Sequence, residues 1–210
     1  MLIGHFSDLH GDLNILRNAM QIPDLWICSG DFFPNKTRGN IPVETKYQTL
    51  WFQKHKNEIL DLLGGIPVLC VGGNHDYVSF ASLLRNVGHE AYEIPRDGID
   101  FMGHRFAGFR EINFIQGEWN GETPVSDMKA IVDQVLDADP DILVTHAPPS
   151  GIFDRGNDYG ISALILSLMY RDHKVKYHFF GHSHLSGGQI HQEMGIIFIN
   201  SACHVQFIEV

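Results

Sequence analysis

Short apolar runs of four to six residues alternate with longer segments of helical period, and this alternation most restricts the fold of the 210-residue chain. An apolar run of that length, bounded by glycine or polar residues, predicts a buried strand. We expect strands at residues 2–7, 25–29, 67–71, 142–145 and 177–181, and helices at about 12–20, 45–63, 80–86, 126–137 and 161–171. The chain therefore has an α/β pattern, with parallel strands early and short antiparallel strands over 90–114 and the last forty residues.

Polar residues that can bind a metal follow each of these five runs, where the strand is expected to end. Ligands collect at the carboxyl ends of strands in an open α/β sheet, so we expect these side chains to meet at one site. Residues i and i+2 share one side of an extended backbone, so we expect Asp8 and His10 on the same side. The candidate residues are Asp8, His10, Asp31, Asn74, His75, His146, His182 and His184.

Without His75, these candidates comprise two carboxylates, one amide and four imidazoles. Seven ligands are too many for one ion but suit two ions about 3.5–4 Å apart, with one carboxylate between them. The mixture of oxygen and nitrogen donors, with no thiolate, favours manganese, iron or zinc in a reactive site over a structural zinc. We expect two divalent metal ions per chain, with Mn²⁺ as the first choice.

Five motifs at these strand ends, SDLHG, GD, GNHD, THAPP and GHSH, occur in an order that resembles the calcineurin-like metallophosphoesterase family. They run from residue 8 to residue 184 and so cover nearly the whole chain. The resemblance implies a four-layer αββα sandwich of two mixed β-sheets flanked by helices, formed as a single domain over residues 1–210. It also implies an enzyme, a metal-dependent phosphoesterase.

The resemblance gives each candidate residue a role. The ligands divide into two sets with one shared carboxylate: Asp8, His10 and His184 for the first metal, Asn74, His146 and His182 for the second, and Asp31 as the bridge. A hydroxide that bridges the metals would attack the phosphoester, and His75 would be the catalytic residue that protonates the leaving group. Phosphodiesters are slightly favoured as substrates.

The sequence departs from one branch of the family immediately after Asp31. The phosphoprotein phosphatases carry GDxxDRG, whose second Asp orients the catalytic histidine, whereas this chain has Pro34 in that position. This departure disfavours a protein phosphatase, and also a dinucleoside polyphosphate hydrolase, which uses the same motif. It leaves open which residue orients His75.

Two other functions are alternatives. A nuclease or nucleotide-processing phosphoesterase acting on short or single-stranded substrates would need Lys and Arg clustered near the site, and here the basic residues are scattered. A non-catalytic scaffold with the same fold would lack some ligands or His75, all of which are present. Because the net charge is −10, extended nucleic acid is disfavoured, and we expect a small phosphoester substrate.

The sequence also predicts where the protein acts. No apolar segment approaches the roughly 18 residues of a membrane span, and the first residues do not resemble a signal peptide. We therefore expect a cytoplasmic protein that does not engage a membrane. The three cysteines, Cys28, Cys70 and Cys203, suggest no disulfide framework. The sequence makes no prediction of oligomeric state.

Some residues near the motifs have more than one interpretation. We expect Asp76 to orient its neighbours, and His5 and His178 to be structural, close enough to support the site. A solvated turn is favoured over a phosphate clamp for residues 154–156, and at least one of Phe32 and Phe33 is expected in the core.

Overall fold

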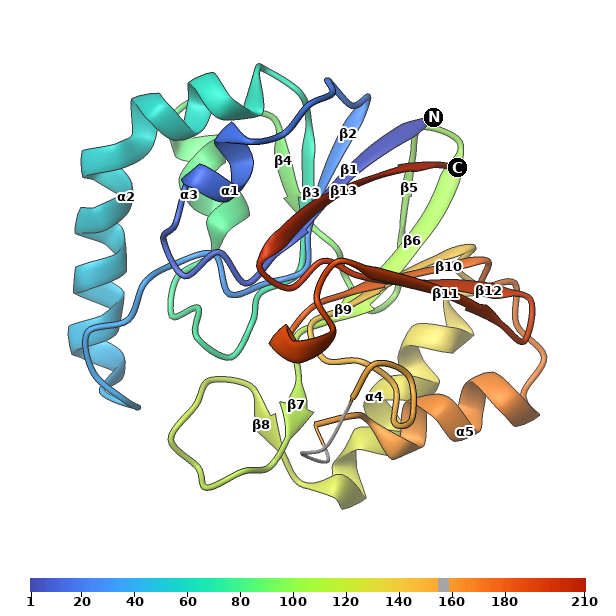
Figure 1. The fold of residues 1–210 in the computed structure, drawn as a ribbon. Helices are drawn as coiled ribbons and strands as arrows, with labels where there is room; N and C mark the ends of the chain where they lie inside the picture. The colour runs from blue at the N-terminus through green and yellow to red at the C-terminus, as the bar shows by residue number, and fades with distance from the viewer. Residues whose placement is uncertain (155–158) are drawn as a thin grey trace.

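The computed structural model describes residues 1–154 and 159–210, which form two large β-sheets packed face to face with helices outside them (Figure 1). The first sheet has the strand order β13-β1-β2-β3-β4, in which β1 to β4 pair in parallel and β13 is antiparallel to β1. Its strands are β1 (Leu2–Ser7), β2 (Leu25–Cys28), β3 (Val68–Cys70), β4 (Ala91–Glu93) and β13 (His204–Glu209). The pairing of β13 with β1 places the two ends of the chain side by side (Figure 1).

The second sheet has the order β11-β12-β10-β9-β6-β5. Its strands are β5 (Ile99–Phe101), β6 (His104–Phe109), β9 (Ile142–Thr145), β10 (Tyr177–Phe180), β11 (Gln189–Glu193) and β12 (Ile196–Asn200). A small two-stranded sheet, β7 (Ile112–Asn113) with β8 (Glu122–Thr123), extends from the end of β6. The loop between β7 and β8 reaches toward the ends of the first sheet's strands (Figure 1).

Helices cover the outer face of each sheet (Figure 1). They are α1 (Asn14–Arg17), α2 (Ile41–Leu63) and α3 (Phe80–Asn86) on the first sheet, and α4 (Val125–Asp137) and α5 (Ser162–Tyr170) on the second. Three hydrophobic clusters separate the layers, and the middle one joins the sheets through residues such as Ile27, Phe106 and Phe179. Burial of these apolar faces is the main source of stability. The order of the layers, helices, sheet, sheet and helices, confirms the expected four-layer αββα sandwich.

Strand pairing late in the chain differs from the expectation. β10 pairs in parallel with both β9 and β12, and β6 pairs in parallel with β9. The reason is that α4 and α5 return the chain across the second sheet between consecutive strands, so β6, β9 and β10 start at the same end. Antiparallel pairing is found at the sheet edges, between β11 and β12 and between β5 and β6.

Two helices differ in length from the prediction. α2 begins at Ile41 rather than near residue 45, because the Asn40 side chain accepts a hydrogen bond from the Val43 amide at 3.2 Å and a proline stands in the first turn. α1 spans only Asn14–Arg17, since the Asp12 carboxylate accepts the Asn14 amide and delays the start of the helix. The polar turn before α1 remains next to the functional site.

His5 and His178 lie fully buried in the strands β1 and β10. His5 Nε2 lies 2.9 Å from the Ser29 hydroxyl, and His178 Nε2 lies 2.8 Å from the Thr145 hydroxyl. Burial lowers the pKa of each to about 3. Both are therefore neutral structural residues at physiological pH.

None of the helices within the described parts of the chain has the length and hydrophobicity needed to cross a membrane. All three cysteines are free, as expected; Cys28 and Cys70 are buried in the first sheet.

Candidate functional site

All eight candidate residues lie where strands end, at one edge of the sandwich. Strands of both sheets contribute, because the parallel strands of each sheet point their carboxyl ends the same way. The residues are Asp8 and His10 after β1, Asp31 after β2, Asn74 and His75 after β3, His146 after β9, and His182 and His184 after β10. The structure thus brings together residues up to 176 positions apart in the sequence.

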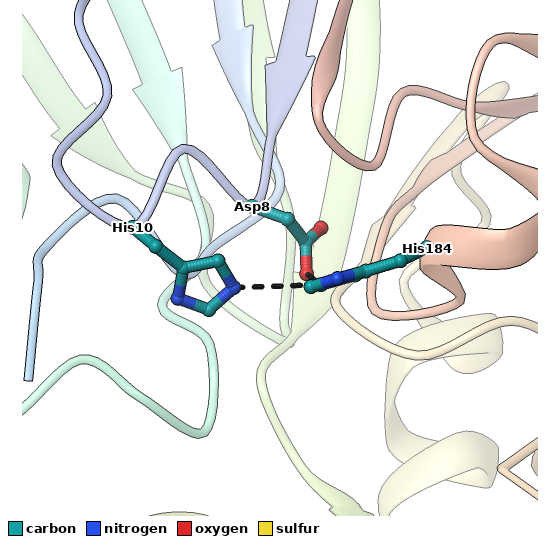
Figure 2. A group of neighbouring side chains, drawn as sticks. All are labelled: Asp8, His10 and His184. Atoms are coloured by element: carbon teal, nitrogen blue, oxygen red, sulfur yellow. Dashed lines mark hydrogen bonds and ion pairs between the residues drawn. The ribbon is translucent and has the colours of Figure 1, made fainter.

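Asp8, His10 and His184 form the first group that can hold a metal ion (Figure 2). One ligand atom of each lies within 4.8 Å of the others, and His184 Nε2 is 3.0 Å from Asp8 Oδ1 and 3.4 Å from His10 Nε2. Figure 2 shows the two rings and the carboxylate pointing toward one another. Two imidazole nitrogens and an oxygen aimed at one point form a donor set that fits manganese, iron or zinc.

Asp31, His146 and His182 form the second group, again with ligand atoms within 4.8 Å of one another. His146 Nε2 lies 3.3 Å from Asp31 Oδ2 and 2.9 Å from the Asn74 side-chain oxygen. His146 Nδ1 donates to the Ser29 carbonyl at 2.8 Å. That hydrogen bond leaves Nε2 as the ring atom that faces the site, which is the usual way a protein orients a ligating histidine.

Asp31 connects the two groups. Besides its contact with His146, its Oδ2 lies 4.0 Å from His10 Nε2, and its Oδ1 accepts the His75 amide at 2.7 Å. Asp76 orients its neighbours, as expected. Its carboxylate accepts hydrogen bonds from the backbone amides of Asp31, Phe33 and Gly73 at 2.8–3.1 Å. The loops after β2 and β3 are therefore tied to each other through one buried carboxylate.

The backbone that presents the ligands is strained. Asp8, His10, Asp31 and His182 have φ angles of 55°, 46°, 54° and 64°, in the left-handed region that residues with a Cβ rarely adopt. Each such residue costs on the order of 1–3 kcal/mol, and such strain is concentrated at functional sites. Gly181 allows the close approach, since a Cβ there would lie 2.1 Å from Asp8 Oδ2.

The charges in the site depend on one another. Burial opposes ionisation of Asp31, but the neighbouring His146 holds the pKa of this carboxyl below its usual value. Burial likewise opposes protonation of His146, yet Asp31 raises its pKa to about 9. The hydrogen bond that His184 donates to the Asp8 carboxylate raises the pKa of His184 to about 10, with a contribution from Cys203. In the metal-free protein at neutral pH, His146 and His184 are therefore protonated, and a metal ion must replace a proton on each ring in order to bind there.

His75, the predicted catalytic residue, lies beside both groups. Its ring centroid is 4.8 Å from that of His10 and 4.1 Å from that of Trp119, and burial lowers its pKa. Its Nδ1 lies 2.5 Å from the side-chain oxygen of Asn35. Asn35 thus contacts His75 where the phosphatase branch uses an aspartate. No sequence motif marks Asn35 as a functional residue, although it directly follows Pro34.

The site opens into a cleft of about 340 Å³. Its lining is Asp31, Asn74, His75, Ile115, Trp119, Tyr159, His182, Ser183, His184 and Leu185. Four of these, Ile115, Trp119, Tyr159 and Leu185, have apolar or aromatic side chains, and all four lie outside the five sequence motifs, although Leu185 directly follows GHSH.

The loop that carries Ile115 and Trp119 is organised around one carboxylate. Glu122 accepts hydrogen bonds from the backbone amides of all five residues from 115 to 119, at 2.7–3.1 Å. Asn120 ties the loop to the strand end of β3, because its amide donates to the Asn74 carbonyl at 3.1 Å. The wall of the cleft is therefore preorganised, and fixed to the same loop that carries His75.

Two further expectations can be compared with the structure. Phe32 and Phe33 are both fully buried and pack against Phe80, so neither lines the cleft. The Asp154 carboxylate accepts the Gly151 amide at 2.7 Å, as in a turn. The rest of the candidate phosphate clamp, Arg155 and Gly156, lies outside the described residues.

Comparison with known proteins supports one family. The family model described as calcineurin-like phosphoesterase matches residues 1–186. A search of curated protein sequences finds no match. Among solved structures, the chain is similar to the Thermus thermophilus sulfate thiohydrolase SoxB in complex with glycerol, with 12% sequence identity and a TM-score of 0.44. The similarity covers 87% of this chain and 35% of that one, so this chain spans about a third of the length of the SoxB chain.

Metal binding should release protons. Since the pKa values of His146 and His184 are raised to about 9 and about 10, a cation must displace about two protons at pH 7, and affinity should rise with pH up to that range. We expect the heat of Mn²⁺ binding, measured by isothermal titration calorimetry at pH 7, to change with the ionisation enthalpy of the buffer. The exposed His191→Ala variant is the control and should behave as the wild type. Heats that are the same in every buffer would contradict the prediction.

Proposed function

This chain belongs to the calcineurin-like phosphoesterase family, and we propose that it is a dinuclear metal-dependent hydrolase of small phosphoesters. The observation that carries the proposal is the position of Asp31 between two groups of metal-binding side chains at the floor of a cleft. Asp8, His10 and His184 would hold one ion, and Asn74, His146 and His182 the other. When bound, such ions supply positive charge for the phosphate oxygens and a water whose pKa is lowered toward 7.

His75 completes the reaction as the proton donor. Its Nδ1 is engaged by Asn35, so its Nε2 is the atom that can carry a proton to the departing oxygen. The packing of the ring against Trp119 and His10 limits its rotation. The histidine is therefore held beside the cleft in one orientation, as general acid catalysis requires.

We further propose that phosphodiesters are the preferred substrates. Among the described residues that line the cleft, there is no Lys or Arg to balance the second negative charge of a monoester. Ile115, Trp119 and Leu185 instead offer apolar surface to the second ester group of a diester. The same lining gives little support to a nuclease, which would need basic residues along a strand. Retention of His75 and all seven ligands argues against a scaffold.

Manganese is the ion that we propose for activity in vitro, with iron or zinc as alternatives, because the donor set mixes carboxylate, amide and imidazole. We propose, from the sequence alone, that the protein acts in the cytoplasm.

The proposal predicts hydrolysis of bis-p-nitrophenyl phosphate in the presence of Mn²⁺. Activity should disappear with a chelator and return when Mn²⁺ is added back, and kcat/KM should be higher than for p-nitrophenyl phosphate. Release of p-nitrophenolate measures both. A folded, metal-loaded protein that hydrolyses neither ester would contradict the function. A higher kcat/KM for the monoester would contradict the diester preference alone.

The loss of turnover in His75→Ala should depend on how basic the leaving group is. Methyl phenyl phosphate leaves behind a basic phenolate that needs a proton, and its turnover should fall by roughly 10²–10⁴. Methyl p-nitrophenyl phosphate, whose leaving group is stable without a proton, should lose much less. Steady-state kinetics on the two diesters test this, with circular dichroism as a folding control. Equal losses on both would assign His75 to binding rather than to proton transfer.

A further inference from the structure

Helix α2 carries two polar side chains on its buried face, outside the predicted metal groups. Glu44 and Gln48 lie one helical turn apart, and both are fully buried. A buried charge is costly unless hydrogen bonds satisfy it. These two residues therefore need an explanation that the hydrophobic core does not supply.

Glu44 shapes the loop that follows Asp31. Its carboxylate accepts the Lys36 amide at 3.0 Å and both the amide and the hydroxyl of Thr37, the hydroxyl at 2.7 Å. It also accepts the side-chain amide of Asn35 at 3.4 Å. A single buried carboxylate thus holds residues 35–37 against α2.

Gln48 holds the loop that contains His75. Its side-chain nitrogen donates to the His75 carbonyl at 2.7 Å, and its side-chain oxygen accepts the Tyr77 amide at 2.8 Å. The His75 amide donates to Asp31. Backbone groups on both sides of His75 are therefore fixed by side chains from other elements.

Asn35 connects these two anchors, and its neighbours determine which way its amide points. Its nitrogen donates to the His75 carbonyl at 3.0 Å and to Glu44, both of which can only accept. The opposite orientation would place an oxygen against two acceptors. The Asn35 oxygen must therefore face His75 Nδ1, 2.5 Å away, and can only accept from it.

We propose that Asn35, held by Glu44, is the positioning residue that keeps Nδ1 of His75 protonated and Nε2 toward the cleft. Nε2 is then the nitrogen that takes up a proton from solvent and passes it to the leaving group. Asn35 takes the place of the aspartate that Pro34 replaces in the GDxxDRG pattern. The catalytic consequence rests on the proposed function, whereas the hydrogen bond itself can be tested without any activity.

The first test is Asn35→Ala, compared with Lys36→Ala. Lys36 is exposed and contributes only its backbone amide to Glu44, so its variant should match the wild type. Asn35→Ala should lower kcat on methyl phenyl phosphate by about 10- to 100-fold, as loss of an orienting partner typically does, with little change in KM. On methyl p-nitrophenyl phosphate the loss should be much smaller.

The second test measures directly which ring nitrogen of His75 carries a proton. In ¹⁵N-histidine spectra of the Zn²⁺-loaded protein, with His75 assigned from His75→Ala, the wild type should show a proton on Nδ1. Asn35→Ala should show a mixture of tautomers. A wild-type ring with no proton on Nδ1 would overturn the proposal, and so would an unchanged spectrum in the variant.

A double variant covers the case in which Asn35→Ala does not fold. Asn35→Asp alone places two carboxylates side by side and should impair the enzyme. Asn35→Asp with Glu44→Gln exchanges donor and acceptor at the contact between these two side chains, while Gln48 still donates to the His75 carbonyl. The double variant should therefore recover part of the activity on methyl phenyl phosphate that Asn35→Asp alone loses. A folded double variant without this recovery, or equal losses on the two diesters in Asn35→Ala, would contradict the proposal. A wild type inactive on every ester would contradict the proposed function, while the tautomer would still decide the role of Asn35.

Discussion

One buried carboxylate determines the arrangement of the site. Asp31 follows a strand of the first sheet, yet its Oδ2 lies 3.3 Å from His146, which follows a strand of the second. A charge buried this deeply is tolerated only where partners surround it. His146, His10 and the backbone amide of His75 are those partners, and they come from three different strand ends. The two sheets must therefore pack in the observed register for Asp31 to remain ionised.

The same constraint explains why the site is strained. Ligands from separate strands converge within 4.8 Å because the backbone turns sharply at Asp8, Asp31 and His182, where φ is positive. Glycines provide the clearance: a Cβ on Gly73 would lie 2.1 Å from Asp31 Oδ1. The hydrophobic clusters on both sides of each sheet offset the cost, since burial of their apolar side chains stabilises the strands that carry these loops. The apolar residues between the layers thus provide stability, while the strained strand ends provide the functional site.

Much of this arrangement could be predicted from the sequence, because strand ends are local signals. An apolar run that stops at Asp8, Asp31 or His146 identifies both the strand and the group that follows it. The residues that complete the site could not be recognised in this way. Glu44 has the polar character of a solvated helix face, and only the packing of α2 against two loops makes it a buried anchor for Asn35. Trp119 faces the cleft because of a loop built on Glu122, another tertiary effect. The parallel pairing of β10 with β9 likewise depends on the crossover through α5 rather than on the strand's own residues.

A crystal structure of the Mn²⁺-loaded protein, with anomalous diffraction recorded to locate the metal, tests the central claim most directly. The account predicts two anomalous peaks about 3.5–4 Å apart, with the Asp31 carboxylate between them and His184 and His146 on opposite sides. A single peak, or two peaks that do not share Asp31, would contradict it.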